Sequence, residues 1–300
     1  MRSLLRTTMR THLFSPLSLL AAAAAVFIGC SFGLSFEAVI DQQENCIYIH
    51  EFSCLAHTVV MFLPAILIPV HTCREFSHGT VRNKLICGVT KTRFLLSEIL
   101  VNMLTAALLF ALVTVPIVIR GEAMLAEKEW LLLARMFLTM LGGYLLCAVI
   151  MTVLCCCIFC SYRALAVVAC TLLLVVCIVG GLRLQRLLWS PRLYERNEYG
   201  TDNYVTVEDP AYIGGAARTL MKTAIFCDPF MQVYISVYEY FPLTGGYDDS
   251  YFDDLKKDLD HSTFDVEEQV YYPCFPLYQA GTALVFTAAG ILILRRRNIR

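Results

Sequence analysis

The chain has 300 residues, of which 58% are hydrophobic and only 16% are charged. Soluble domains carry about 25% charged residues, so this composition argues against an ordinary water-soluble protein. The mean hydropathy is +0.62, and several apolar runs reach the roughly 20 residues that a helix needs to cross a bilayer. We therefore predict an all-α polytopic membrane protein. The formal net charge of -1 gives no indication of a nucleic-acid partner.

Residues 1–12 carry Arg2, Arg6 and Arg10 at a spacing of four, which places the three side chains on one helical face. We predict a cytoplasmic interfacial helix here. Transmembrane helices 1 to 5 are predicted within residues 13–182. The segment 274–300 is predicted to hold the sixth helix and a cytoplasmic basic tail.

Six apolar segments are candidates for the spans. The second is short and contains Pro64 and Pro69, which membrane helices tolerate where neighbours or water satisfy the freed carbonyls. The six segments are approximately residues 13–34, 55–70, 94–119, 130–160, 164–182 and 275–294.

Basic residues are divided unequally between the two sides of this topology. One side carries thirteen Lys and Arg residues, whereas the short loops of the other side carry only Arg120 and Lys128. Because Lys and Arg are enriched in cytoplasmic loops, we expect a multi-pass protein of the cell membrane with both termini cytoplasmic. The thirteen residues are Arg2, Arg6, Arg10, Arg74, Arg82, Lys84, Lys91, Arg93, Arg163, Arg295, Arg296, Arg297 and Arg300.

A large extracytoplasmic segment, residues 183–273, is predicted between the fifth and sixth spans. It holds eight Lys or Arg and sixteen Asp or Glu residues, and its pattern leaves its fold open. Residues 216–240 are apolar enough to form an amphipathic helix against the outer leaflet. The cysteines predicted outside are Cys46, Cys54, Cys227 and Cys274. We expect at least one disulfide among them, most simply Cys46 with Cys54 or Cys227 with Cys274, and free thiols are the alternative.

We predict no metal site in this chain. The thiols of residues 155–160 have no His or carboxylate nearby, and the acidic cluster of residues 248–260 lacks the glycine of a calcium loop. Two charges fall inside predicted spans. Arg135 is expected to extend its charged end toward the membrane surface, and Glu98 to pair with cytoplasmic arginines.

The loop between the second and third spans, residues 73–93, is polar, basic and bracketed by glycine. Val81, Leu85 and Ile86 recur at helical spacing, which predicts a short amphipathic helix with one face available to a partner. On chemistry alone, a loop that only fixes the topology explains the same pattern.

This loop resembles the hallmark of type-2 ABC exporter permeases. In that family an acidic residue, a GT-hydrophobic-RNKL core and an LS pair at the head of the next helix recur together, as Glu75, residues 79–85 and residues 96–97 do here. Residues 290–300 resemble the basic tail of the family, although Leu294 replaces an aromatic residue and Asn298 replaces an aspartate. The residues that would couple to an ATPase are Glu75, Gly79, Thr80, Arg82, Asn83, Lys84, Gly88 and Arg93.

The resemblance implies the permease subunit of an ATP-driven exporter. Such a subunit pairs with a second permease copy or a homologous permease and binds an ABC ATPase through a coupling helix, which would be the helix of this loop. We expect Glu75, Arg82 and Lys84 to be surface charges whose reversal costs little stability.

The chain itself is expected to be neither an enzyme nor a cofactor-binding protein. It lacks the G-x-x-x-x-G-K-[ST] phosphate loop, so ATP and Mg would be bound by the partner ATPase. The substrate stays open. The alternative function is a non-transporting membrane sensor or assembly protein with an extracytoplasmic binding domain. Co-purification of an ATPase distinguishes the two.

Overall fold

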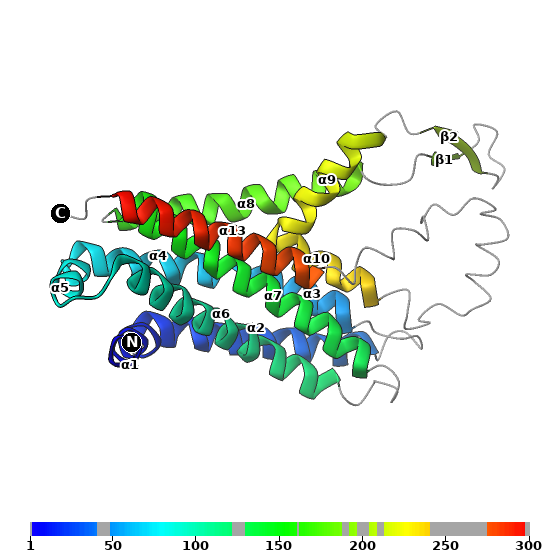
Figure 1. Cartoon of the computed structure of the whole chain (residues 1–300). Coiled ribbons are helices and arrows are strands. Elements are labelled where there is room, and N and C mark those ends of the chain that lie inside the picture. The colour runs from blue at the N-terminus through cyan, green and yellow to red at the C-terminus, as the bar shows by residue number, and fades with distance from the viewer. Residues whose placement is uncertain are drawn as a thin grey trace.

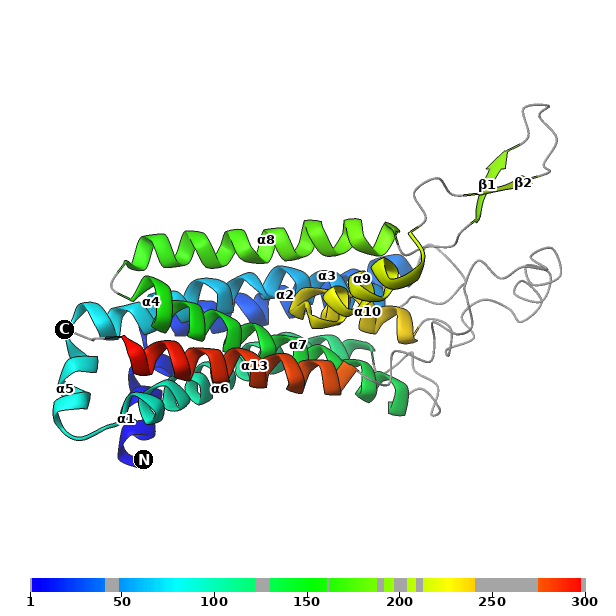
Figure 2. The same ribbon diagram turned by 45° about the horizontal axis from the view of Figure 1, so that its top comes forward.

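The computed structural model describes residues 2–40, 49–121, 130–160, 162–187, 192–196, 204–208, 213–240 and 275–297. In this part of the chain the structure is helical apart from one two-stranded hairpin. The long helices lie lengthwise beside one another (Figure 1). The N-terminus, the short helix α5 (Thr80–Ile86) and the C-terminal end lie at one end of this bundle, and the hairpin lies at the other (Figure 2).

The first two helices are joined by a bend. Helix α1 (Arg2–Leu13) lies at 61° to α2 (Pro16–Ile40). The Ser15 hydroxyl accepts a hydrogen bond from the backbone N–H of Ser18 at 3.1 Å, and Pro16 is the first helical residue. A capping serine followed by proline is a typical start of a helix. The bend therefore separates the two helices close to the predicted boundary between residues 12 and 13.

The next span is built from two helices, α3 (Ile49–Val60) and α4 (Phe62–Ser77). The break at Met61 lies just before Pro64, which has no N–H to donate to the preceding turn. The candidate span covers Leu55–Ser77 and is longer than the predicted 55–70. The first residues of the predicted loop therefore belong to α4.

Four further helices run the length of the bundle. They are α6 (Lys91–Gly121), α7 (Trp130–Leu154), α8 (Arg163–Leu187) and α13 (Phe275–Arg296). Helix α7 continues into a π-helical turn, η2 (Cys155–Phe159), which Cys160 closes with an N–H to the Cys155 carbonyl at 2.8 Å. In the described residues, five helices are long and apolar enough to cross a membrane, and a sixth if the bent pair of α1 and α2 is one span.

The described residues between α8 and α13 form two pairs of short elements. Strands β1 (Arg192–Arg196) and β2 (Tyr204–Glu208) pair antiparallel, with Arg192 opposite Glu208. Helices α9 (Gly215–Cys227) and α10 (Pro229–Tyr240) follow. Cys227 has no disulfide partner among the described residues. Cys46, Cys274 and the acidic cluster lie outside the described residues, as does the side chain of Cys54, so the disulfide stays a prediction.

The prediction of one amphipathic helix over residues 216–240 is wrong. The helix breaks at Asp228, whose carboxylate accepts the backbone N–H groups of Phe230 and Met231 at 2.9 and 3.3 Å and caps α10. Phe230, Met231 and Val233 are buried, and α10 packs against α3, α7 and α8. The apolar side chains of α10 therefore pack inside the protein, whereas Leu220 of α9 is 72% exposed.

Buried polar side chains connect the helices. The His57 ring on α3 lies 3.3 Å from the Thr114 hydroxyl on α6 and 3.3 Å from the Tyr144 hydroxyl on α7. On α6, the Asn102 amide donates to Thr72 of α4 and Thr152 of α7 at 3.2 and 2.9 Å. Each partner supplies the hydrogen bond that a buried polar group requires.

The contact between α7 and α10 leaves no room for a side chain at Gly143. A Cβ added there would lie 2.7 Å from the Pro229 carbonyl oxygen and 2.9 Å from Val233 Cγ2. We predict that Gly143→Val destabilises the protein by about 1–3 kcal/mol through overpacking. Gly281→Val on α13 is the matched control, because nothing lies within 4 Å of a Cβ at that position. Equal thermal unfolding temperatures of the two variants in detergent would contradict the insertion of α10.

Candidate functional site

Helix α5 is flanked by two glycines whose backbone conformations other residues rarely adopt. Gly79 has φ +69° and Gly88 has φ +88°. After α5, the N–H of Gly88 bonds to the Leu85 carbonyl at 3.0 Å and the N–H of Val89 to the Lys84 carbonyl at 3.1 Å. This pair of bonds is the Schellman motif, which needs a left-handed residue at Gly88. The two bracketing glycines of the sequence are therefore the residues that turn the chain into and out of α5.

One face of α5 packs on the bundle. Val81 is 1% exposed and belongs to an apolar cluster with Phe94 and Leu95 of α6, and Leu85 packs against the same cluster. Ile86 is 73% exposed, so the prediction that it shares this face is wrong. Ile86 lies a further 100° around the helix axis from Leu85, which turns its side chain away from the packed face.

Beside this contact lies a cluster of buried charges. The Lys84 ammonium of α5 lies 2.5 Å from Oε2 of Glu75 on α4 and 3.6 Å from Oε1 of Glu98 on α6. It also donates to the Thr8 hydroxyl of α1 at 3.2 Å and lies 5.4 Å from the centre of the Phe94 ring. The Lys84 and Glu75 side chains are 11% exposed and that of Glu98 is 0% exposed.

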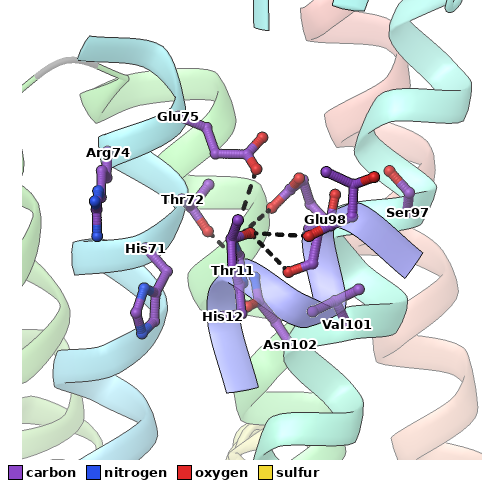
Figure 3. A network of polar contacts seen from close by, with 12 residues as sticks. Thr11, His12, His71, Thr72, Arg74, Glu75, Ser97, Glu98, Val101 and Asn102 are labelled. Atoms are coloured by element: carbon purple, nitrogen blue, oxygen red, sulfur yellow. Dashed lines mark hydrogen bonds and ion pairs between the residues drawn. The ribbon is translucent and has the colours of Figure 1, made fainter. Parts of the chain in front are cut away.

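The imidazole of His12 on α1 completes the cluster. Its Nε2 lies 3.9 Å from Oε1 of Glu75 and 3.8 Å from Oε2 of Glu98 (Figure 3). The ring stacks on His71 with 4.9 Å between centroids. His71 Nε2 in turn lies 2.9 Å from the Ser18 hydroxyl. The cluster therefore joins α1, α4, α5 and α6 at the end of the bundle that holds both chain ends.

The structure corrects two expectations about these charges. Glu75 and Lys84 are buried against each other, so they are not surface charges whose reversal costs little. Glu98 pairs with Lys84 and His12 and not with the cytoplasmic arginines. The reason is that Glu98 lies about two helical turns into α6 and is buried, while Arg93 is exposed at the start of the helix. The other proposed coupling residues are Arg82, Asn83 and Gly88, which are exposed, and Gly79 and Thr80, which are partly buried.

Other basic residues at this end hold helix ends together. Arg163 of α8 donates to the Ser77 hydroxyl at the end of α4 through Nε at 3.0 Å. Lys91 donates to the Arg297 carbonyl at 2.6 Å, and Arg297 donates to the Cys157 carbonyl at 2.5 Å. Cations at the carboxyl ends of helices satisfy free carbonyls and interact favourably with the helix dipole.

His12 and Thr8 are the members of the cluster that the sequence analysis missed. They are four residues apart on α1 and lie on the face opposite Arg6 and Arg10, which are exposed. The sequence did carry a signal for them. Thr8 and His12 form a polar pair on the face of α1 that points away from its arginines. Arg135, by contrast, is exposed, which agrees with a charged end directed out of the bundle.

Comparison with known proteins adds no relative to this geometry. No protein-family model matches the chain. No curated protein matches it either. Arguments about function therefore rest on the residues of this chain.

We predict that Lys84→Met destabilises the protein by about 3 kcal/mol, because removing one partner of a buried ion pair leaves uncompensated charge. Arg82→Met on the same helix is the matched control, and an exposed site of this kind changes stability by about 0.5 kcal/mol or less. Thermal unfolding in detergent measures the difference, and amide exchange should accelerate in α5 of Lys84→Met. Unchanged unfolding and exchange would show that the ammonium does not hold α5.

Proposed function

We propose that this chain is the permease subunit of an ATP-driven ABC exporter and that α5 is its coupling helix. The observation that supports this most is the double attachment of α5. Its Val81 face and its Lys84 side chain are fixed to the spans, while Arg82 and Asn83 are exposed at the end of the bundle. An element that passes motion from a partner to the membrane needs both a rigid inner contact and a free outer face.

The charge cluster gives the proposal a physical route for that motion. Lys84 is held between Glu75 at the end of α4 and Glu98 near the start of α6. A displacement of α5 therefore acts on two candidate spans at once, and on α1 through Thr8. Charges in a buried setting resist separation more strongly than surface pairs do.

The proposed partners follow from the same role. An ABC ATPase subunit, which carries ATP and Mg, docks on the exposed face of α5. A second permease copy or a homologous permease pairs with the chain in the bilayer. Helices α8 and α13 offer apolar faces for such a pairing or for lipid, because Leu172, Val176, Leu284 and Leu292 are exposed on them. The substrate class is not part of the proposal.

The proposed localisation is the cell membrane, with both termini and α5 cytoplasmic. It is supported by the thirteen Lys and Arg residues assigned to one side and by the common location of the N-terminus, α5 and the end of α13 (Figure 1). The hairpin of β1 and β2 then lies outside.

This orientation predicts the labelling of two thiols. Cys87 is exposed at the end of α5, and Val205→Cys places a second thiol in β2. A membrane-impermeant maleimide applied to intact cells should modify residue 205 and spare Cys87, which becomes reactive once the membrane is permeabilised. Peptide mass spectrometry resolves the two sites among the other cysteines. Modification of Cys87 in intact cells would overturn the orientation.

The coupling role is tested at Arg82. Reversing its charge with Arg82→Glu should lower the amount of ATPase that co-purifies with the tagged chain about tenfold or more, because a charge clash in a docked interface costs several kcal/mol. Membrane insertion and the unfolding temperature should stay unchanged, since Arg82 is exposed. The readouts are the stoichiometry of a subunit with a phosphate-loop motif and the ATPase activity of the purified complex.

Arg196→Glu in β1 is the control, because it makes the same charge reversal on the hairpin at the other end of the bundle. It should leave the complex intact. If the wild-type chain brings down no ATPase, or a partner without ATPase activity, the sensor or assembly function replaces the proposal. If Arg82→Glu binds the ATPase as the wild type does, α5 is not the docking element.

A further inference from the structure

The charge cluster of His12, Glu75, Lys84 and Glu98 contains buried groups without hydrogen-bond partners and more carboxyl groups than ammonium groups. Two carboxyl groups face one ammonium, so one negative charge is left over in a buried site whenever both carboxyls are ionised and His12 is neutral. Among the described residues, neither ring nitrogen of His12 and neither carboxylate oxygen of Glu98 has a hydrogen-bond partner. Buried polar groups without partners are rare, and an unpaired buried charge is more costly still. The cluster therefore calls for a stronger cation than one ammonium.

We propose that His12, Glu75 and Glu98 form a binding site for a divalent metal cation, which exchanges with the Lys84 ammonium. The three residues supply one imidazole nitrogen and two carboxylate oxygens, and these ligand atoms all lie within 4.8 Å of one another. Their side chains converge from α1, α4 and α6 (Figure 3). The site was not expected from the sequence, because no two of the three ligands are close in the chain.

The ligand atoms must move closer together before all three can bind one ion. His12 Nε2 lies 3.9 Å from Glu75 Oε1 and 3.8 Å from Glu98 Oε2. Ligand atoms that each lie about 2.0–2.2 Å from one ion are roughly 3.0–3.6 Å from each other. The two edges from His12 must therefore shorten by roughly 0.2–0.9 Å. The third edge, between the carboxylate oxygens of Glu75 and Glu98, is at most 4.8 Å long. One nitrogen and two oxygens form a donor set that suits divalent ions of the first transition row.

Lys84 competes for the same two carboxylates. With the ammonium in place the cluster keeps one negative charge, whereas a divalent ion in its place balances both carboxylates. The Lys84 side chain is 11% exposed, so its long stem can move the ammonium into water. The bound ion would then hold α1, α4 and α6 together and release the tether of α5. That last consequence for coupling rests on the proposed function, and the cation site does not.

Mn²⁺ is the probe for the test. The chain has 14 cysteines, and thiolates attract softer ions such as Zn²⁺ more strongly than they attract Mn²⁺. The full chain, purified in detergent, is titrated with Mn²⁺ while the signal of free Mn²⁺ is followed by electron paramagnetic resonance. We expect one ion per chain. Loss of a ligand in Glu98→Gln or His12→Gln should weaken binding at least about tenfold. Lys84→Met should tighten binding, since the competing ammonium is gone.

His71→Gln is the matched control, because His71 stacks on His12 while its Nε2 already faces the hydroxyls of Ser15 and Ser18. It should keep wild-type affinity for Mn²⁺. Pulsed electron paramagnetic resonance gives a second readout through the coupling of Mn²⁺ to a histidine nitrogen. That coupling should be present in the wild type and in His71→Gln and absent in His12→Gln.

Three outcomes would overturn the proposal. They are wild-type affinity in both ligand variants, weaker binding in Lys84→Met, and uptake of a proton by the cluster with no Mn²⁺ bound at all. Size-exclusion elution and thermal unfolding check that each variant folds. Should Glu98→Gln not fold, Glu98→Asp is the second variant, because it keeps the charge on a side chain that is one methylene shorter. It must still weaken the binding of Mn²⁺. The titration needs no ATPase, so its failure leaves the proposed function standing.

Discussion

The end of the bundle that carries α5 depends on one buried ammonium. The Lys84 ammonium lies between the carboxyl groups of Glu75 and Glu98, and α1 contacts this cluster through Thr8 and His12. Charges in such a setting have lost most of their water, so the arrangement is favourable only while its members remain together. The attachment of α5 is for this reason expected to have two states, with the ion pairs either formed or broken. Apolar packing of Val81 alone would allow gradual sliding.

The basic residues that set the charge asymmetry of the sequence have separate structural tasks. Arg163 and Arg297 bind the ends of helices, and Lys84 lies inside the protein. Arg82 on α5 and Arg93 in the first turn of α6 are exposed. A count of Lys and Arg captures their common effect on topology. Such a count cannot show which of these side chains are exposed and available to bind another protein.

Much of the fold could be predicted from the sequence, because long apolar runs report the bilayer directly. The runs at residues 94–119, 130–160, 164–182 and 275–294 all fall on helices that are long enough to cross it. Glycines around α5 were equally informative, since a left-handed backbone at Gly79 and Gly88 requires them. Periodicity failed for α10, because an apolar face looks the same whether lipid or protein covers it.

The candidate site was only half predictable. Its loop carries a local pattern that predicts a short helix, and the structure has a helix there over Thr80–Ile86. The burial of Glu75 and Lys84 depends on which helices stand behind the loop, and that is decided by contacts between residues distant in the chain. His12 lies in the segment 1–12, which was predicted to be an interfacial helix from the spacing of its arginines alone. Contacts with residues distant in the chain, more than spacing along the sequence, determine whether a charged side chain is exposed to a partner or buried between helices.

Helix α10 has a consequence for where anything could pass through this protein. It occupies the half of the bundle near the hairpin, with Phe230, Met231 and Val233 pressed between α3, α7 and α8. In the described residues this interior is thus filled with side chains, as a soluble protein core is. If the chain is the permease proposed above, α10 closes the space between these helices, and cargo would pass along the outer face of the bundle, against a neighbouring molecule.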